Sequence, residues 1–204
     1  MTEASVRVDG RSRRAERTRR AIVDALLALL DEGNMKISAG RIAERAGVSL
    51  RALWTNFRDM ETLYAAAGQR MLELQRAEYR PVPPDLPLRA KVEAFCRQRC
   101  RMLEIMAPAA RVAHLWQPYS PQLRRNRAIQ IAWVREEIDD LFGHELDTAG
   151  DGRDRLRDAV LVATTFNWWQ MAHDELGLGD DEVRELMVRT VTSLLVTAFA
   201  ASVG

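Results

Sequence analysis

Residues 38–57 read SAGRIAERAGVSLRALWTNF, and this stretch decides the fold of the N-terminal part of the chain. Ser38 and Ser49 each precede a short segment with apolar residues at helical spacing, and a serine in this place accepts a hydrogen bond from a free N–H of the first turn. Gly47 lies between the two segments and allows the left-handed backbone that a three-residue turn requires. The stretch therefore predicts two short helices joined by a tight turn, a helix-turn-helix.

Helical spacing of apolar residues recurs along the rest of the chain, whereas no segment alternates as a half-buried strand does. Gly and Pro residues separate the periodic segments, and Asp59 is in place to cap the helix that follows it. We therefore expect an all-α protein. Its nine helices are predicted at about 17–32, 38–46, 49–57, 59–79, 88–107, 109–117, 121–142, 153–176 and 180–202.

The basic residues gather at the N-terminal end of the chain. Residues 1–58 contain twelve basic and seven acidic residues, a net charge of +5, whereas residues 59–204 contain 18 basic and 22 acidic residues, a net charge of −4. Six of the arginines lie between Arg11 and Arg20. A basic segment attracts polyanions such as nucleic acid, although the arginine run taken alone fits a solvated tail equally well. The chain thus divides into a basic head and a mildly acidic body.

Composition excludes several classes of protein. Two cysteines are too few for a secreted disulfide framework, and no apolar run approaches the length of about 20 residues that spans a bilayer. The first residues contain no continuous apolar segment of the kind that directs export. We therefore expect a cytoplasmic protein with no membrane partner, and the excess of 28 arginines over two lysines suggests a GC-rich bacterial coding sequence.

Residues 41–64, RIAERAGVSLRALWTNFRDMETLY, resemble the helix-turn-helix of the TetR-family transcriptional regulators. The resemblance extends from Arg17 to Tyr64, and the nine predicted helices agree with it over the whole chain. It implies a TetR-like fold with a DNA-binding domain at 1–58, which carries the basic N-terminal arm, and an effector-binding and dimerisation domain at 59–204.

The resemblance also implies a function. It implies a repressor that binds a palindromic operator in double-stranded DNA as a homodimer and is therefore located at the nucleoid. A small, mainly apolar effector is expected to release the repressor from the operator. The two subunits are expected to pair through the last two helices, at about 153–176 and 180–202, in a four-helix bundle. The apolar stripe of the last helix is wide, which favours a partner helix from a second chain.

The resemblance places part of the second short helix in the major groove. Arg51 is the best candidate for reading a base, because a guanidinium can bond guanine O6 and N7 together. Ser38 and Trp54 are expected to contact phosphates, as is the amide of Asn56. The residues on the groove-facing side are Ser49, Leu50, Arg51, Ala52, Thr55 and Asn56.

Two further positions of this head bear on DNA affinity. Met60 stands where the family usually has a lysine at the start of the next helix, so that phosphate contact is left to the helix N-terminal amides, with Arg58 in compensation. Leu53 and Phe57 are expected in the core. The alternative function is a helical small-molecule-binding or scaffold protein whose DNA-binding head has degenerated, and Met60 is its support.

The body is rich in Met and aromatic residues, which can line a plastic apolar pocket but more often form ordinary core. His114 and His173 are possible polar anchors for a ligand. We expect four residues to face an effector cavity: Met102, Trp116, Trp133 and Trp169.

The sequence contains no P-loop, no G-x-S-x-G and no H-E-x-x-H, so we expect no enzyme, no cofactor and no metal site. Cys96 and Cys100 lie one helical turn apart. We interpret them as small buried apolar residues, with a thiol switch or a soft-metal site as the alternative.

Overall fold

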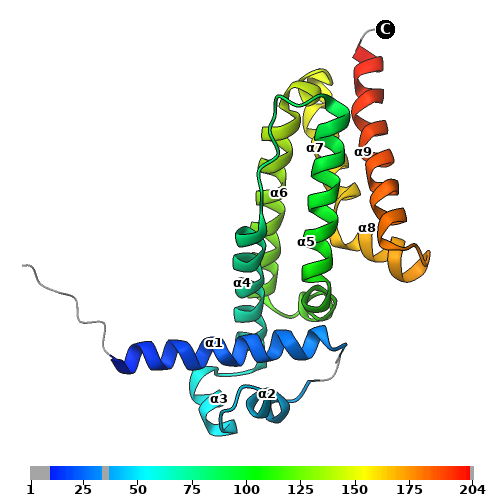
Figure 1. Ribbon diagram of the computed structural model, residues 1–204. Helices are drawn as coiled ribbons and strands as arrows, with labels where there is room; N and C mark the ends of the chain where they lie inside the picture. The colour runs from blue at the N-terminus through cyan, green and yellow to red at the C-terminus, as the bar shows by residue number, and fades with distance from the viewer. Residues whose placement is uncertain (1–9, 34–36, 203–204) are drawn as a thin grey trace, which may run out of the picture.

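The computed structural model describes residues 10–33 and 37–202, and over these residues the chain is all-helical (Figure 1). Nine α-helices follow one another in this part of the chain: α1 (Gly10–Asp31), α2 (Ala39–Arg45), α3 (Leu50–Asn56), α4 (Met60–Glu78), α5 (Leu88–Trp116), α6 (Pro121–Asp147), α7 (Arg153–Ala163), α8 (Phe166–Gln170) and α9 (Asp180–Ser202). A 3-10 turn at Gly150–Gly152 precedes α7, and a π-helical turn at Met171–Glu175 follows α8. The predicted fold class and number of helices are confirmed.

The chain is divided among these helices differently from the prediction. The segments expected at 88–107 and 109–117 form one helix, α5, with Pro108 inside it. Proline removes one backbone hydrogen bond, but α5 packs against both the body and the head, and this burial on both sides of Pro108 outweighs the local cost. In addition α1 begins at Gly10 rather than near Arg17, and α6 continues past a kink at Phe142.

The single helix expected at 153–176 is broken. Thr164 leaves helical geometry, with φ −121° and ψ 17°, and its hydroxyl donates to the carbonyl of Val160 at 3.0 Å. The carbonyl of Thr164 then accepts a hydrogen bond from Nη2 of the buried Arg99, at 3.0 Å. A guanidinium of α5 therefore satisfies the carbonyl that the break exposes, which no spacing within 153–176 could reveal.

Short-range signals set the helix starts in the head. Ser38 Oγ accepts from the N–H of Arg41 at 3.4 Å, and Ser49 Oγ accepts from the N–H of Ala52 at 3.1 Å. Asp59 forms a reciprocal capping box at the start of α4. Gly47 has φ +66°, as the turn between α2 and α3 requires.

The apolar side chains form two cores. The head core joins α1, α2 and α3 with Leu63 and Ala67 of α4 and with Val112 of α5. The body core lies among α5, α6, α7, α8 and α9. Figure 1 shows α1 across the lower ends of α4 and α5, with α2 and α3 on the side away from the body. The head is therefore joined to the body through α4 and α5.

Helices α4 and α6 approach each other closely at Gly68. A Cβ built on Gly68 would lie 2.7 Å from Asn126 Nδ2, and this same amide donates to the carbonyl of Ala65 at 3.1 Å. The missing side chain thus allows an amide of α6 to bond the backbone of α4. This bond fixes α4, the helix that connects the head to the body, against α6.

The variant Gly68→Ala tests this close approach. We expect it to lower the free energy of unfolding by about 1–3 kcal/mol, because the new methyl group displaces Asn126 from Ala65. Urea denaturation measures the change. The matched control is Gly143→Ala in α6, where an added Cβ meets nothing within 4 Å and a gain of about 0.5–1 kcal/mol is expected. Equal gains in the two variants would contradict the account.

Candidate nucleic-acid interface

The turn between α2 and α3 is held by the backbone. The N–H of Val48 donates to the carbonyl of Ala43 at 3.0 Å, and Ile42 and Ala43 are buried beneath it. On α3, Leu53 is 0% exposed and Phe57, at the C-cap, is 2% exposed, as expected from the sequence. Because this side of α3 is buried in the head core, the opposite side faces outward.

The outward side carries most of the residues expected to contact DNA. Leu50 and Trp54 are large apolar residues that are nevertheless exposed, and Arg51 makes no ion pair with any described residue. Ala52 and Asn56 are half-buried at the edge of this face. The exposed members are Ser38, Ser49, Leu50, Arg51, Trp54, Thr55 and Arg58. The outward side of α3 therefore carries Leu50, Arg51, Trp54 and Thr55, with the exposed Ser49 at its N-cap.

Several polar groups on this surface already have partners. Thr55 Oγ1 donates to the carbonyl of Arg51 and Asn56 Nδ2 donates to the carbonyl of Ala52, each at 2.8 Å. Arg58 Nε lies 2.9 Å from Asp59 Oδ2. The hydrogen bond from the Thr62 backbone, together with Arg58, holds the pKa of Asp59 below its ordinary value. Arg51 is thus freer than Asn56 to contact a ligand.

Arg19 of α1 has a role that the sequence did not single out. Its Nη1 donates to the carbonyl of Asn56 at 2.6 Å, and its guanidinium lies over the ring of Phe57, 4.1 Å from the centroid. Both contacts fall at the C-terminal end of α3. Arg19 therefore fastens α1 to α3, whereas in the sequence it is one of six similar arginines between Arg11 and Arg20.

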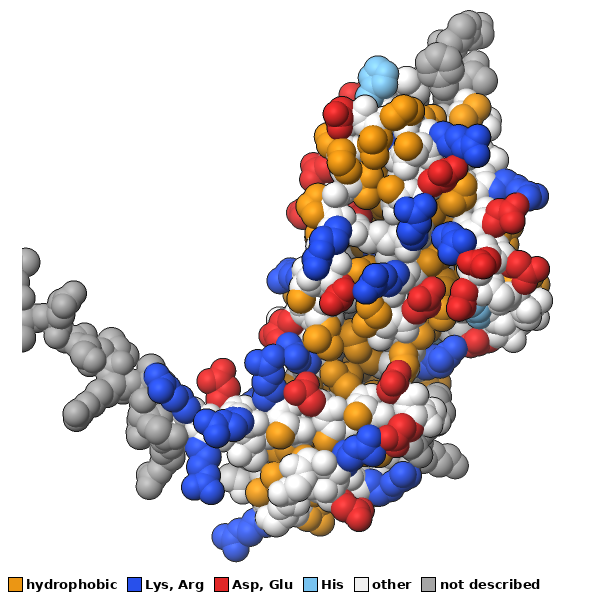
Figure 2. All heavy atoms as spheres, in the orientation of Figure 1, with side chains coloured by type: hydrophobic (Ala, Val, Ile, Leu, Met, Phe, Trp, Pro, Cys, Tyr) orange, Lys and Arg blue, Asp and Glu red, His pale blue; other side chains and the backbone are white. Residues whose placement is uncertain are grey.

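Much of the basic segment is helical. Because α1 begins at Gly10, the arginine run continues the helix rather than preceding it, and its described arginines are exposed (Figure 2). A helix holds these cations at fixed spacing along α1, and Arg19 is the one that contacts α3. The expected arm is therefore helical over the described residues from Gly10 onward.

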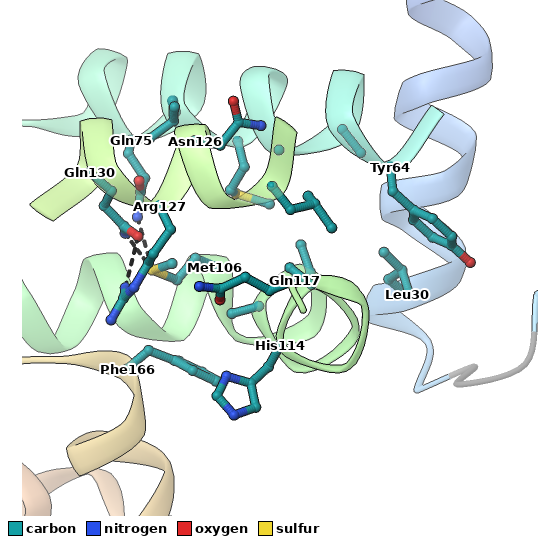
Figure 3. A pocket seen from close by; sticks show the side chains of 18 of the residues that line it. Leu30, Tyr64, Gln75, Met106, His114, Gln117, Asn126, Arg127, Gln130 and Phe166 are labelled. Carbon is teal, nitrogen blue, oxygen red and sulfur yellow. Dashed lines mark hydrogen bonds between the residues drawn. The ribbon is translucent and has the colours of Figure 1, made fainter. Parts of the chain in front are cut away.

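A cavity of about 320 Å³ lies in the body, between α4, α5 and α6, and reaches α1 (Figure 3). None of the four residues expected to line an effector cavity lines this one, although His114 does. Met102 and Trp169 are buried elsewhere, Trp116 is exposed and stacks on Tyr64, and Trp133 packs edge-on against Tyr79. The helical spacing of apolar residues indicates which side chains face the interior. It does not indicate whether such a side chain packs against another helix or lines a cavity.

Solved structures with the same arrangement of helices identify the fold of this chain. No family model matches the chain, and no curated protein matches it. A solved transcriptional regulator from Rhodococcus sp. Rha1 superposes with a TM-score of 0.67 at 17% identity, covering 91% of this chain and 97% of its own. A candidate TetR-family transcriptional regulator from Mesorhizobium loti superposes with a TM-score of 0.65 at 18% identity, covering 90% and 98%. The chain has the TetR-like fold.

Met60 occupies the first position of α4 in this TetR-like head. Its uncharged side chain is half-buried and packs against the head core, and it cannot attract a phosphate by charge. The nearby cation is Arg58, whose side chain is 81% exposed. The compensating phosphate contact of Arg58 stays a prediction, and in the structure this side chain pairs with Asp59.

The cysteines are core residues of the TetR-like body. Cys96 and Cys100 are both buried, and burial raises the pKa of the Cys100 thiol to about 12. A protonated, buried thiol is a poor nucleophile and a poor metal ligand. Within residues 10–33 and 37–202, no group of three or more metal-ligating side chains comes together, and no helix is long and apolar enough to cross a membrane.

The variant Arg19→Met tests the attachment of α1 to α3. We expect it to lower the free energy of unfolding by about 1 kcal/mol, since a hydrogen bond and a cation–π contact at an exposed site are lost together. Thermal unfolding measures the change. Arg20→Met is the matched control, because Arg20 is the adjacent exposed arginine of α1. Equal effects of the two variants would rule out a specific role for Arg19.

Proposed function

We propose that this protein is a TetR-family transcriptional regulator that binds a specific operator as a homodimer and responds to a small molecule. The observation that carries the proposal is the outward face of α3. This face exposes Arg51 and Trp54 next to the N-cap residue Ser49. On the other side, Leu53 is buried and holds the helix in the head core. This arrangement suits insertion of the N-terminal part of α3 into a major groove.

The charge of the head supports the same proposal. Exposed arginines lie along α1, which packs against α3, and a basic surface is attracted to phosphates irrespective of sequence. Arg51 then supplies base recognition, whereas Arg58 and the N-terminal end of α4 supply phosphate contacts. These roles, with those of Ser38, Thr55 and Asn56, remain the proposed DNA contacts.

The homodimer is proposed to form through the last helices of the body. Val162 of α7 is 62% exposed and Val196 of α9 is 50% exposed, although both helices also pack into the body core. Exposed valines on adjoining helices are suited to pack against the same helices of a second copy. A palindromic operator then matches the two-fold symmetry of the protein.

The response to a ligand is proposed to depend on the cavity. Leu30 of α1 and Tyr64 of α4 line the same cavity as Gln130 of α6. A ligand within it therefore contacts both the head and the body, and a ligand that prefers one arrangement of these two parts shifts the population toward it. We expect the ligand to favour an arrangement that releases DNA, which makes the protein a repressor.

The second candidate function is a ligand-binding or scaffold protein with a degenerate head, which is favoured by Met60. The two candidates differ in how they bind DNA. A regulator retains some DNA fragments strongly, whereas a degenerate head gives uniformly weak binding.

Selection of genomic fragments by the purified protein at about 150 mM salt is expected to recover an inverted repeat, because this salt weakens binding that depends on charge alone. Arg51→Ala is expected to lower the affinity for that repeat by about 1–3 kcal/mol and to change binding to mixed DNA little. Fluorescence anisotropy measures the affinity of both proteins, wild type and variant, for the inverted repeat and for mixed DNA.

Arg58→Ala is the matched control for this experiment. As the loss of a phosphate contact, it is expected to weaken binding to both DNAs and to reduce the slope of log affinity against log salt by about one. Recovery of no preferred sequence, or an equal loss on both DNAs for Arg51→Ala, would support the second candidate.

Val162→Glu tests the proposed dimer. We expect the mass in solution to fall from that of two chains to that of one, because each subunit would bury an unpaired carboxylate in the dimer interface. Light scattering after size exclusion measures the mass. Ile129→Glu, at an exposed apolar residue of α6, is the matched control and should leave the dimer intact. A dimer that survives Val162→Glu places the interface elsewhere.

A further inference from the structure

We propose that the cavity between α4, α5 and α6 takes an organic acid with an apolar body, whose carboxylate pairs with Arg127. The inference names the ligand class of the regulator proposed above, and it rests on that proposal only for the consequence at DNA.

The cavity is lined by one permanent cation and by no carboxylate. Its titratable lining residues are Tyr64, His114 and Arg127, and no Asp or Glu is among the described residues that line it. The cation is half-buried, so its charge is partly removed from water. The lining therefore favours an anion over a cation or a neutral molecule.

Arg127 differs from the other buried cations of the body. Lys91 has Glu145 Oε1 at 2.7 Å from its Nζ, and the charge of Arg99 is partly balanced by Glu137. Arg127 instead donates from Nη1 to the neutral Gln130 Oε1 at 3.1 Å and makes no ion pair with a described residue. Burial lowers its pKa, and no neighbouring carboxylate opposes this shift. A ligand carboxylate would supply the missing partner.

The hydrogen-bonding groups at the same end of the cavity are mostly donors. Gln75 Nε2 and Gln130 Nε2 both donate to the sulfur of Met106, each at 3.1 Å (Figure 3). A thioether is a weak acceptor, so two amides on one sulfur are poorly satisfied. A carboxylate oxygen is a stronger acceptor for these amides. The fully buried Gln75 Oε1 has no donor, which suits a hydroxyl group on the acid.

The opposite end of the cavity is apolar. Leu30 and Tyr64 lie there, away from the group formed by Gln75, Gln130 and Arg127 (Figure 3). At about 30 Å³ for each non-hydrogen atom, the cavity holds an acid of about ten such atoms. The ligand is therefore oriented, with the carboxylate at Arg127 and the apolar body toward the head.

Octanoate and octanamide test the proposal, because they have equal size and differ in charge. Titration calorimetry on the full chain at neutral pH is expected to show at least about tenfold tighter binding of octanoate. The pair cinnamate and cinnamamide repeats the comparison with a flat body of about the same size. Equal affinities within each pair, or no binding of either acid at about 1 mM, would overturn the proposal.

Arg127→Met is expected to reduce the preference for each acid to less than about threefold, since the cation is lost while the length of the side chain is kept. Arg127→Lys keeps the charge without the planar fork and should give an intermediate preference. The matched control is Arg125→Met on the exposed side of α6, which should retain the full preference. An Arg127→Met protein that folds and still prefers the acids contradicts the assignment.

The effect on DNA is measured separately, with the recovered operator fragment. Release of the fragment by octanoate supports both the ligand class and the proposed function. Selective binding of octanoate with no change in DNA affinity keeps the ligand class but overturns the regulatory response. Failure of the proposed function and failure of this inference are therefore distinguishable.

Discussion

The burial of Leu53 and Phe57 in the head core is the interaction on which the candidate interface depends. These two side chains fix the rotation of α3 about its own axis, so the opposite side of the helix faces outward, with Leu50, Arg51, Trp54 and Thr55 exposed. Arg19 adds a second restraint, because it bonds the C-terminal end of α3 to α1. A short helix that is held on one side and at one end presents its other side as a rigid surface.

The same restraint extends into the body through α4. Leu63 and Ala67 of α4 belong to the head core, while Gly68 and Asn126 hold the next turn against α6. The cavity opens directly beyond this contact, and its lining includes Gly68 and Asn126. The cavity and the head core therefore share one helix, so the proposed ligand would contact the same helix that holds the head.

The local features of the head were predictable because neighbours in the sequence determine them. A serine before a helix, a glycine in a tight turn and an apolar stripe act within a few residues, and Ser38, Ser49 and Gly47 behave as expected. The helix boundaries of the body were less predictable. Pro108 does not end α5 because packing on both sides of it outweighs a local preference, and Thr164 ends α7 where Arg99, distant in sequence, bonds its carbonyl.

By itself, the sequence determined the all-helical class, the helix-turn-helix and most of the residues that α3 presents to solvent, although Ala52 and Asn56 are half-buried, because each of these features depends on local spacing and on a polar or apolar choice. Only the tertiary structure decided the position and polarity of the cavity. Met102 and Trp169 are inward-facing but fill core, whereas Gln75 and Arg127 line the open space. The physical reason is that a cavity is the volume left between helices from distant parts of the chain. Its position therefore cannot be derived from the sequence of any one helix.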